Sequence, residues 1–362
     1  MKKVVIGMSG GVDSSVAAIL LKKQGYDVIG LFMRNWDSSI NNDILGNPDL
    51  NSDICPQEKD YNDALKVCEK IGIPLHRIDF VKEYWDYVFT YFLDELKRGR
   101  TPNPDIMCNK YIKFDMFAKE ARKLGADYIA TGHYAINEYD ESRKRYLLKR
   151  PADRSKDQTY VLYSLTQNQL AHTLFPIGNL EKSQVREIAE EAGLVNSKKP
   201  DSQDICFVPD GDYASFIRAF KGTDSPCGDF VDVNGKILGK HKGIINYTIG
   251  QRKGLGIALG KPVYVVSKDI ENNKIVIGNE ADLYTSELVA EDVNIISQED
   301  IFEPVKITAK TRYSQTEQPA TLSKLENGDY KVVFDNPQRA VTKGQAVVFY
   351  DGDIVVGGGT IK

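Results

Sequence analysis

The chain has 362 residues, a formal net charge of −4 and 41% hydrophobic residues. This length predicts two or three domains, and the composition is that of a globular protein with ample material for a core. The negative net charge excludes a uniformly basic nucleic-acid binder, so an RNA partner would have to be bound by local patches.

The cysteine content and the N-terminal residues indicate in which cellular compartment the protein works. Five cysteines without a CxxC pair or a regular framework favour a reducing environment. The apolar run after Met1 breaks at Gly7 and is followed by Asp13, which makes it too short for a signal peptide. No stretch reaches the length of a membrane span. We therefore expect a cytoplasmic protein without membrane contact.

The chain opens with a strand, a glycine turn and a helix. Residues 3–8 predict a buried strand, and residues 16–23 predict a helix that ends at Gly25. Between them stands Ser9-Gly10-Gly11-Val12-Asp13-Ser14-Ser15. The glycines allow the backbone to approach a phosphate, and the hydroxyls and the helix N–H groups add donors. A capped Gly-Gly turn is the alternative, but strand, loop, acid and helix follow in order, so we predict a phosphate-binding loop.

This loop differs from two common phosphate loops. A kinase-type loop has a lysine after its last glycine, whereas Asp13 follows Val12 here. The dinucleotide fingerprint needs a glycine spacing that this segment lacks. The loop resembles instead the SGGxDS loop of the PP-loop ATP pyrophosphatases, which cleave ATP between the α and β phosphates and adenylate an oxygen of their substrate. The resemblance implies ATP, with Mg²⁺ as its counter-ion.

Strands alternate with helices up to residue 131. Strands are predicted at 27–33, 74–79 and 127–131, and helices at 57–70, 83–97 and 112–124. This alternation is typical of an α/β fold with a doubly wound parallel sheet, in which ligands bind beyond the carboxyl ends of the strands. Ser9, Met33, Gly132 and His133 stand at such ends. The segment 35–54 has no periodicity and predicts a loop over the site.

The next stretch, up to about residue 192, has shorter predicted strands and helices, and part of it is strongly basic. A hairpin is expected at 134–150, followed by short helices to about residue 192. Residues 142–156 carry seven basic side chains against Asp153 alone. A run of like charges is usually just a solvated face of the protein. Because this run stands close to the predicted site, we give a patch that binds the RNA backbone at least equal weight.

The composition changes after about residue 210. Asn-Gly and Asn-Asn turns predict hairpins at 229–237 and 262–277, with a basic glycine-rich loop at 247–256 between them. Beyond residue 283, short alternating strands with turns at Asn327-Gly328 and Asp351-Gly352 predict a small barrel. We therefore predict a PP-loop ATP-binding catalytic domain at 1–209, a small β-rich central domain at 210–282 and a C-terminal β-barrel domain at 283–362.

Two cysteines stand in unusual sequence contexts. Cys108 follows a Thr-Pro-Asn-Pro-Asp loop and is expected to open a helix, where the thiolate is favoured relative to the usual pKa of about 8.5. Cys206 lies in the run DSQDICF, with acids on one side. These flanks argue against simple core positions, although spacing alone does not show that the two thiols meet. The other three are interpreted as inert buried thiols: Cys55, Cys68 and Cys227.

Six motifs occur together, in the order SGGVDSS, TPNPDIMCNKYIKF, ATGHYA, SKDQTYVLY, DSQDICFV and YTIGQRKGLGI. In these motifs, and over nearly its whole length, the chain resembles the tRNA-specific 2-thiouridylases. The resemblance implies ATP-dependent 2-thiolation of the wobble uridine of tRNA through adenylation of the uracil 2-oxygen. It further implies a persulfide on Cys206, received from a cysteine desulfurase or a sulfur-relay protein, with Cys108 as the nucleophile or resolving thiol.

The same resemblance assigns further residues. Asp105 is a candidate base as well as a contact to the target base, with a turn or capping acid as the alternative. The implied ATP contacts are Gly7, Met8, Ser9, Gly10, Gly11, Val12, Asp13, Ser14, Met33 and Gly132. The implied tRNA contacts are Asn103, Pro104, Asp105, His133, Lys156, Asp157, Gln158, Arg312, Tyr313 and Gln345.

For several of these residues an ordinary structural role is the alternative. His133 could be a strand-end histidine bonded to the backbone. Ser155 and Gln158 fit a capping box. The last three tRNA contacts could be plain barrel surface.

Other functions stay open at this point. A PP-loop ligase or amidotransferase would adenylate a carbonyl for attack by nitrogen and would need neither Cys108 nor Cys206. A nucleotide-sensing module would bind ATP without releasing pyrophosphate. A thiolase with an iron–sulfur cluster would need CxxC ligands, which the sequence lacks. The chain is expected to act as a monomer.

Overall fold

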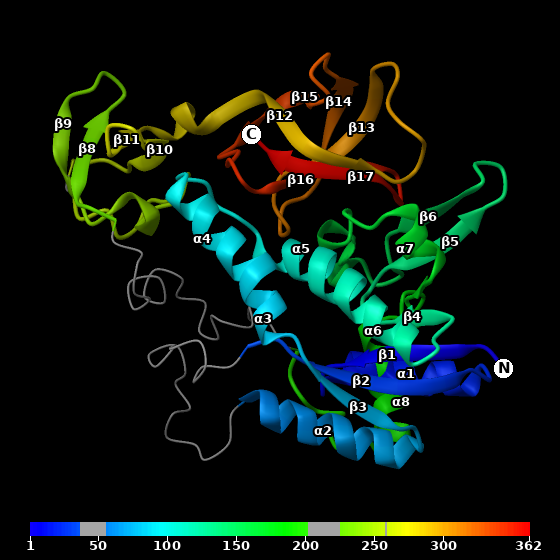
Figure 1. Ribbon diagram of the computed structural model, residues 1–362. Coiled ribbons are helices and arrows are strands. Elements are labelled where there is room, and N and C mark those ends of the chain that lie inside the picture. The colour runs from blue at the N-terminus through cyan, green and yellow to red at the C-terminus, as the bar shows by residue number, and fades with distance from the viewer. Residues whose placement is uncertain (37–55, 202–224, 258) are drawn as a thin grey trace.

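The computed structural model describes residues 1–36, 56–201, 225–257 and 259–362 (Figure 1). Cys55, Cys206 and most of the predicted loop at 35–54 therefore lie outside the described residues. The described chain forms a five-stranded, a four-stranded and an eight-stranded sheet. None of the helices in these ranges combines the length and the apolar character that crossing a membrane requires.

The first sheet is parallel throughout, as predicted, with the order β3-β2-β1-β4-β7. Its strands are β1 (Lys3–Met8), β2 (Asp27–Arg34), β3 (Leu75–Asp79), β4 (Tyr128–Ala130) and β7 (Thr173–Leu174). Val4, Val5 and Ile6 of the middle strand β1 are completely buried, as a strand covered on both faces requires. The sequence does not predict β7, because two residues show no periodicity.

Helices cover both faces of this sheet, which confirms the doubly wound α/β fold. On one face pack α1 (Val12–Lys23), α2 (Pro56–Ile71) and α8 (Lys182–Glu191). On the other face one helical run consists of α3 (Val81–Tyr84), η1 (Trp85–Phe89) and α4 (Thr90–Lys97). A second run consists of α5 (Pro104–Met107), η2 (Cys108–Met116) and α6 (Phe117–Lys123). In Figure 1, α2 lies below the sheet and α5 and α6 lie above it.

The second helical run begins well before the predicted helix at 112–124. Asn103 explains the difference, because its Oδ1 accepts a hydrogen bond from the backbone N–H of Asp105 at 3.1 Å, and Pro104 stands at the first helical position. Both features are typical of a helix start. Each run also contains a π-helical segment, η1 or η2, and such segments are frequent at functional sites.

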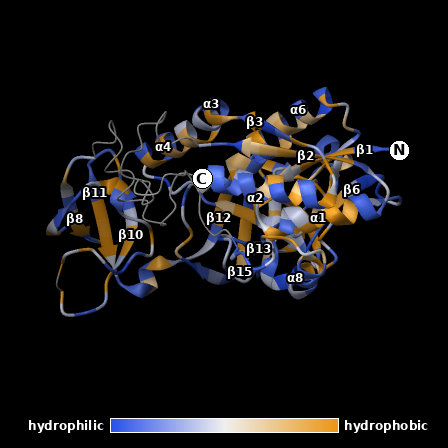
Figure 2. Ribbon diagram, turned by 90° about the horizontal axis from the view of Figure 1, so that it is seen from below, coloured by the Kyte–Doolittle hydropathy of each residue, from blue (hydrophilic) through white to orange (hydrophobic). Residues whose placement is uncertain are grey.

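Both predicted hairpins of the central region form. The first pairs β8 (Gly228–Asp232) with β9 (Ile237–His241), and the second pairs β10 (Tyr264–Asp269) with β11 (Lys274–Gly278). A parallel pairing of β11 with β8 joins them into one sheet. This sheet packs against a small core of its own, which includes Val265 and Ile277, and Figure 2 shows hydrophobic stretches in its strands.

The predicted C-terminal barrel is closed. Six antiparallel strands follow in the order β12-β15-β14-β13-β16-β17, and a pairing of β12 with β17 completes the ring. The strands are β12 (Tyr284–Ile295), β13 (Val305–Lys310), β14 (Gln318–Lys324), β15 (Tyr330–Arg339), β16 (Ala346–Asp351) and β17 (Ile354–Ile361). The predicted turns join β14 to β15 and β16 to β17. The limits of the three domains stay a prediction.

A hairpin of the N-terminal domain extends the barrel sheet. The hairpin predicted at 134–150 consists of β5 (Ile136–Asp140) and β6 (Arg145–Lys149), and Lys149 pairs with Ile354 of β17. Leu148 and Tyr350, from the two sides, belong to one hydrophobic core, so the barrel is fixed to the parallel-sheet domain. The short remaining elements are η3 (Arg154–Lys156), η4 (Thr159–Val161), α7 (Gln167–Ala171), η5 (Ile244–Asn246) and η6 (Glu280–Leu283).

Candidate active site

A tight glycine turn connects β1 to α1 at the carboxyl edge of the parallel sheet. Gly10 has a φ of +74°, and a Cβ at this position would lie 2.3 Å from the backbone oxygen of Asp60, so only glycine fits. The helix begins directly after Gly11, earlier than predicted. The hydroxyls of Ser14 and Ser15 explain this, because they donate to the Gly11 carbonyl oxygen at 3.2 and 2.8 Å and fix the first turn.

The start of α1 offers hydrogen-bond donors to a ligand. Within the described residues no side chain caps this helix, whose N-cap is Gly11. The N–H groups of the first turn therefore have no side-chain acceptor, and the positive end of the helix dipole faces the turn. The end of β4 approaches from the other side, since a Cβ on Gly132 would lie 2.6 Å from the backbone N of Ser14.

The structure brings the predicted nucleotide-contact residues together. Gly7 and Met8 end β1, Met8 pairs with Phe32, and Met33 is the next residue of β2. With Gly132 and the turn they line the carboxyl edge of three neighbouring strands, where doubly wound sheets bind ligands. The turn and the first helical residues contribute Ser9, Gly10, Gly11, Val12, Asp13 and Ser14. Their contact with ATP stays a prediction.

Two residues that sequence reasoning missed contact Asp13. The Nζ of Lys182, at the start of α8, lies 2.7 Å from Asp13 Oδ1, and the Tyr134 hydroxyl donates to the same oxygen at 2.9 Å. Burial and the charge of Asp13 raise the pKa of Tyr134, so this hydroxyl stays a donor. Tyr134 belongs to the motif ATGHYA, but nothing in the sequence indicates that it or Lys182 contacts Asp13, because both meet Asp13 only through the packing of distant segments.

Lys199 and Asn196 hold the glycine turn from another side. Asn196 Nδ2 donates to the carbonyl oxygen of Gly10 at 3.0 Å, and Lys199 Nζ lies 3.3 Å from the same oxygen. Lys199 Nζ also lies 2.7 Å from a carboxylate oxygen of both Asp60 and Asp63. Burial opposes the charge of this lysine, but the two carboxylates raise its pKa. A glycine cradle, an uncapped helix start and two lysines fit a bound polyphosphate.

The segment at the start of α5 holds the predicted base contacts Asn103, Pro104 and Asp105. Asn103 caps the helix, so Asp105 is not the capping acid, but it does stand as an acid in the first turn of the helix, as the alternative of a turn acid has it. Asp105 is exposed to solvent as a residue. Even so, partial burial of its carboxyl group raises the pKa of that group, and the charge of Lys113 opposes this rise. A raised pKa brings a carboxylate toward the range of a general base.

Cys108 lies on the same helical run and is 5% exposed. The expectation that it opens the helix is wrong, because the helix begins at Pro104 and Cys108 stands where α5 passes into η2. Its neighbour Asn109 donates from Nδ2 to the Asp105 carbonyl oxygen at 2.9 Å, while its buried Oδ1 has no partner in the described part of the chain. Cys206, the implied second thiol, lies outside the described residues.

The remaining cysteines differ in their burial. Cys68, on α2, is buried as predicted, and this burial raises the pKa of its thiol to about 12, which disfavours the reactive thiolate. The expectation of burial is wrong for Cys227, which is exposed. It stands just before β8, where its backbone oxygen accepts a hydrogen bond from Asn273 Nδ2 at 3.1 Å. Cys55 lies outside the described residues.

The side chains of the predicted triplet Lys156, Asp157 and Gln158 are all engaged by other residues of the protein. Lys156 Nζ pairs with Asp201 at 2.9 Å, and the Asp157 carboxylate is buried and engaged by Arg150 at 3.1 Å. Gln158 Oε1 accepts from the Tyr134 backbone N–H at 2.8 Å. The alternative of a capping box between Ser155 and Gln158 is wrong, because the carboxylate of Asp153 caps η3.

The three predicted contacts in the barrel lie against the other domains. Gln345 Nε2 donates to the Thr101 carbonyl oxygen at 2.7 Å, just before the base-contacting segment. Arg312 Nη2 donates to the Ala340 oxygen at 2.8 Å and to the Ile249 oxygen of the central glycine-rich loop at 3.4 Å. Tyr313 is 46% exposed, but its ring packs edge-on against Tyr160 of the N-terminal domain, with 5.9 Å between the ring centroids. These side chains are therefore junction residues rather than plain barrel surface.

His133 is buried between two aromatic rings. Its ring centroid lies 5.8 Å from that of Phe114 and 6.2 Å from that of Phe175, and Nδ1 is 2.8 Å from the hydroxyl of Thr131. The expected alternative of a bond to the backbone is replaced by this side-chain bond. Burial, aided by the charge of Lys113, lowers the pKa of His133 well below its ordinary value, so the imidazole is neutral.

We expect His133 to make the fold acid-sensitive. Below the unfolded-state pKa of about 6.5 the unfolded chain binds a proton that the folded chain does not, so the free energy of unfolding decreases as the pH falls. One such group contributes a slope of up to about 1.4 kcal/mol per pH unit. In urea unfolding between about pH 7 and 5, His133→Gln should flatten the slope. Parallel curves for the two proteins would contradict this.

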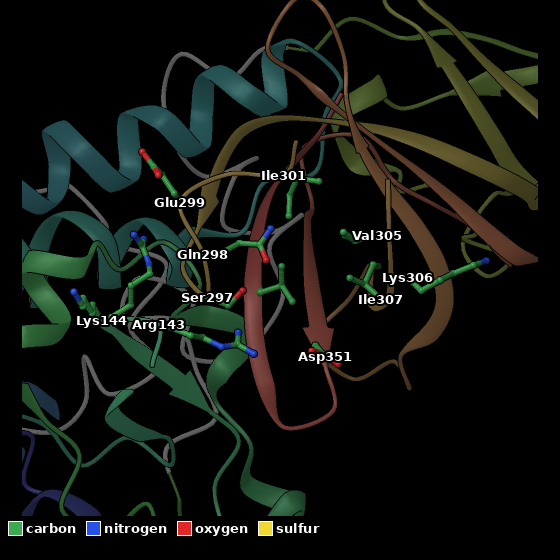
Figure 3. A pocket seen from close by; sticks show the side chains of 12 residues that line it. Arg143, Lys144, Ser297, Gln298, Glu299, Ile301, Val305, Lys306, Ile307 and Asp351 are labelled. Atoms are coloured by element: carbon green, nitrogen blue, oxygen red, sulfur yellow. The ribbon is translucent and has the colours of Figure 1, made fainter. Parts of the chain in front are cut away.

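The basic run at 142–156 is mostly neutralised. Ion pairs join Lys149 to Glu138, Arg150 to Asp157, Arg154 to Asp353 and Lys156 to Asp201. The run is therefore not one continuous cationic surface. Its hairpin tip, residues 143–145, lines a cavity of about 550 Å³ together with barrel residues that include Ser297, Gln298 and Lys306 (Figure 3).

Comparison with known proteins covers almost the whole chain. Residues 2–210 match the family model described as tRNA methyl transferase HUP domain, residues 215–279 the tRNA methyl transferase PRC-barrel domain, and residues 285–361 the aminomethyltransferase beta-barrel domain. Among solved structures, a 4-thiouridine synthetase–RNA complex with bound ATP has a TM-score of 0.37 and 19% identity, over 58% of this chain and 46% of that chain. Nothing about this chain's ligands follows from so distant a likeness.

Curated relatives are much closer. The tRNA-specific 2-thiouridylase of Clostridioides difficile is 55% identical, over 100% of this chain and 98% of the relative. That of Acetivibrio thermocellus is 54% identical over 100% and 99%, and that of Mycoplasma capricolum is 50% identical over 99% and 98%. With this identity along its full length, the chain belongs to the tRNA-specific 2-thiouridylases, a family of tRNA sulfurtransferases.

Proposed function

We propose that the chain exchanges the 2-oxygen of the wobble uridine of tRNA for sulfur, in a reaction driven by ATP. The observation that carries the proposal is the glycine cradle between β1 and α1, closed by Gly132 and flanked by Lys182 and Lys199. ATP binds there with its β and γ phosphates toward the turn, with Mg²⁺ as counter-ion. Pyrophosphate then leaves from the cradle.

Adenylation solves the leaving-group problem of the reaction. A uracil carbonyl oxygen is a very poor leaving group, but after attack on the α-phosphorus of ATP it departs as AMP. Asp105, with its raised pKa, accepts the N3 proton of the base as the oxygen attacks. Asn103 and Pro104, at the start of the same helix, hold the base against the nucleotide.

Two thiols deliver the sulfur. Cys206 carries a persulfide received from a donor protein, a cysteine desulfurase or a relay protein. Either Cys108 attacks the inner sulfur and releases hydrosulfide, which attacks carbon 2, or the outer sulfur attacks carbon 2 first and Cys108 then cleaves the adduct. Both orders expel AMP and leave a Cys108–Cys206 disulfide, which an external thiol reductant must reduce before the next cycle.

The proposal is tested by mass spectrometry of the wobble nucleoside after incubation of tRNA with the protein, ATP and a persulfide source. We expect the mass change of one sulfur-for-oxygen exchange, dependent on ATP and accompanied by pyrophosphate. A PP-loop ligase would leave the nucleoside without sulfur, and a nucleotide sensor would release no pyrophosphate. An unchanged nucleoside in the complete reaction would overturn the proposal.

The ion pairs of the basic run predict which charges bind RNA. Lys144 forms no ion pair within the described chain and is exposed, whereas Lys149 is held by Glu138 at 2.6 Å. Lys144→Gln should therefore lower the slope of log K against log salt for tRNA binding by about one unit. The matched variant Lys149→Gln should leave the slope unchanged. Equal slopes for Lys144→Gln and the wild type would contradict a phosphate contact at the hairpin tip.

The proposal also includes the substrate, the cellular compartment and the partners of the protein. The family membership makes tRNA the substrate, and the reactive thiols require a reducing compartment, so the protein acts in the cytoplasm. In this proposal the protein acts as a monomer. It must contact the sulfur donor directly, because persulfide transfer requires one thiol to attack the other protein's persulfide.

A further inference from the structure

The cavity at the tip of the β5–β6 hairpin lies between this hairpin and the barrel (Figure 3). Its volume of about 550 Å³ is many times that of a water molecule, roughly 30 Å³. The basic side chains that line it are Arg143, Lys144 and Arg145 of the hairpin and Lys306 of β13. The carboxylates that line it belong to Glu299 and Asp351, so positive charge is in excess.

Ser297 brings a buried hydroxyl to the wall of this cavity. The residue is 2% exposed, and its backbone N–H donates to the Val356 oxygen at 3.3 Å, which fixes it against β17. Within residues 1–36, 56–201, 225–257 and 259–362, the Ser297 hydroxyl has no hydrogen-bond partner. Because buried polar groups are nearly always hydrogen-bonded, this donor is available to a ligand in the cavity.

Arg145 is fixed beside this serine. Its Nε donates to the Ile296 carbonyl oxygen at 3.1 Å, and Gln167 Nε2 donates to the same oxygen at 3.1 Å. Gln167 also bonds to the backbone N–H and carbonyl of Tyr146, at 2.8 Å each, which holds the hairpin in place. Ile296 directly precedes Ser297. In the described part of the chain no hydrogen bond or ion pair engages the two Nη nitrogens of Arg145, so they can serve a ligand.

These groups match the chemistry of one phosphate group. A guanidinium binds phosphate oxygens through parallel N–H bonds, and serine hydroxyls and lysines are common further donors to a nucleic-acid backbone. Lys144 adds an exposed charge that no ion pair neutralises among the described residues. The exposed carboxylates of Glu299 and Asp351 would repel a second phosphate. The cavity therefore fits a single phosphate better than a run of phosphates.

We propose that this cavity binds one phosphate of the tRNA backbone, through Arg145, Ser297 and Lys144. This inference rests on the proposed function, because it takes tRNA as the substrate, and it adds a contact that joins the hairpin and the barrel to the same phosphate. Inorganic phosphate and the product pyrophosphate carry the same chemistry, so the test includes both.

The test measures the affinity for tRNA between about 50 and 200 mM salt. Ser297→Ala should weaken binding about tenfold without changing the slope of log K against log salt, because a neutral donor releases no counterion. Arg145→Gln should weaken binding and lower the slope by about one unit. Arg145→Lys, which keeps the charge but loses the fork, should weaken binding at an unchanged slope.

Ser164→Ala is the matched control. The Ser164 hydroxyl is also buried without a partner among the described residues, but it does not line the cavity, so this variant should bind tRNA as the wild type does. Unfolding in urea shows that each variant is folded. Wild-type affinity for tRNA in folded Ser297→Ala, or a changed salt slope in that variant, would overturn the inference.

The same variants distinguish the sources of the phosphate. Binding of inorganic phosphate and of pyrophosphate is measured by calorimetry at constant ionic strength. If Ser297→Ala and Arg145→Gln weaken only the binding of these free anions and leave the affinity for tRNA unchanged, the inference is overturned. Formation of 2-thiouridine by the wild type is measured separately. Its absence despite intact binding of tRNA would overturn the proposed reaction and not this contact, since the binding measurement needs neither ATP nor a persulfide.

Discussion

Cys206→Ser and Cys108→Ser are each expected to lower 2-thiouridine formation to background, a loss of at least about a thousandfold. A serine at either position cannot carry a persulfide or form the disulfide that releases the sulfur. Binding of ATP should be retained, because the proposed cradle is built from the β1–α1 turn, Gly132, Lys182 and Lys199. The measurement is the amount of 2-thiouridine in tRNA, together with the affinity for ATP in the same preparations.

The matched control for the thiol variants is Cys227→Ser. This cysteine is exposed and stands outside the parallel-sheet domain, so a general loss of thiol reactivity would show here. We expect wild-type thiolation from this variant. Thiolation that survives in Cys206→Ser would contradict the two-thiol mechanism.

Gly10→Ala is expected to weaken ATP binding by at least about 100-fold, which corresponds to roughly 2.7 kcal/mol. The left-handed backbone at Gly10 costs a residue with a Cβ about 1–2 kcal/mol. In addition, the Cβ would lie 2.3 Å from the Asp60 oxygen, so the turn or α2 must shift. The measurement is a titration with ATP, followed by calorimetry or fluorescence.

Gly235→Ala separates these two costs. Gly235 also has a positive φ, of +85°, but a Cβ there meets nothing within 4 Å. It should therefore lose a little stability and keep its ATP affinity. Equal ATP affinity in Gly10→Ala and Gly235→Ala would contradict the placement of the polyphosphate in the turn.

The parts of the fold that depend on local pattern could be predicted from the sequence. The β-branched run before Ser9, the alternation of strands and helices, and the Asn327-Gly328 turn each carry their structural signal within a few residues. The parallel sheet and the closed barrel follow from such signals. The helix start at Asn103 was also readable, because an Asn-Pro pair is a helix-start signature.

The rest depends on packing between distant segments. Lys182 meets Asp13, and Gln345 meets Thr101, only because the domains fold against one another. The ion pairs of the basic run could not be predicted either, since Glu138 and Asp353 neutralise Lys149 and Arg154 from another strand and from a turn of the barrel. A charge count along the chain registers neither kind of contact.

The most direct test of the central claim follows the oxygen that leaves. Transfer RNA with oxygen-18 at the 2-position of the wobble uridine is incubated with the protein, ATP and a persulfide source, and the products are examined by mass spectrometry. We predict that the label appears in the phosphate group of AMP, in step with formation of 2-thiouridine. Label in water or in pyrophosphate, with unlabelled AMP, would contradict adenylation of the uracil oxygen.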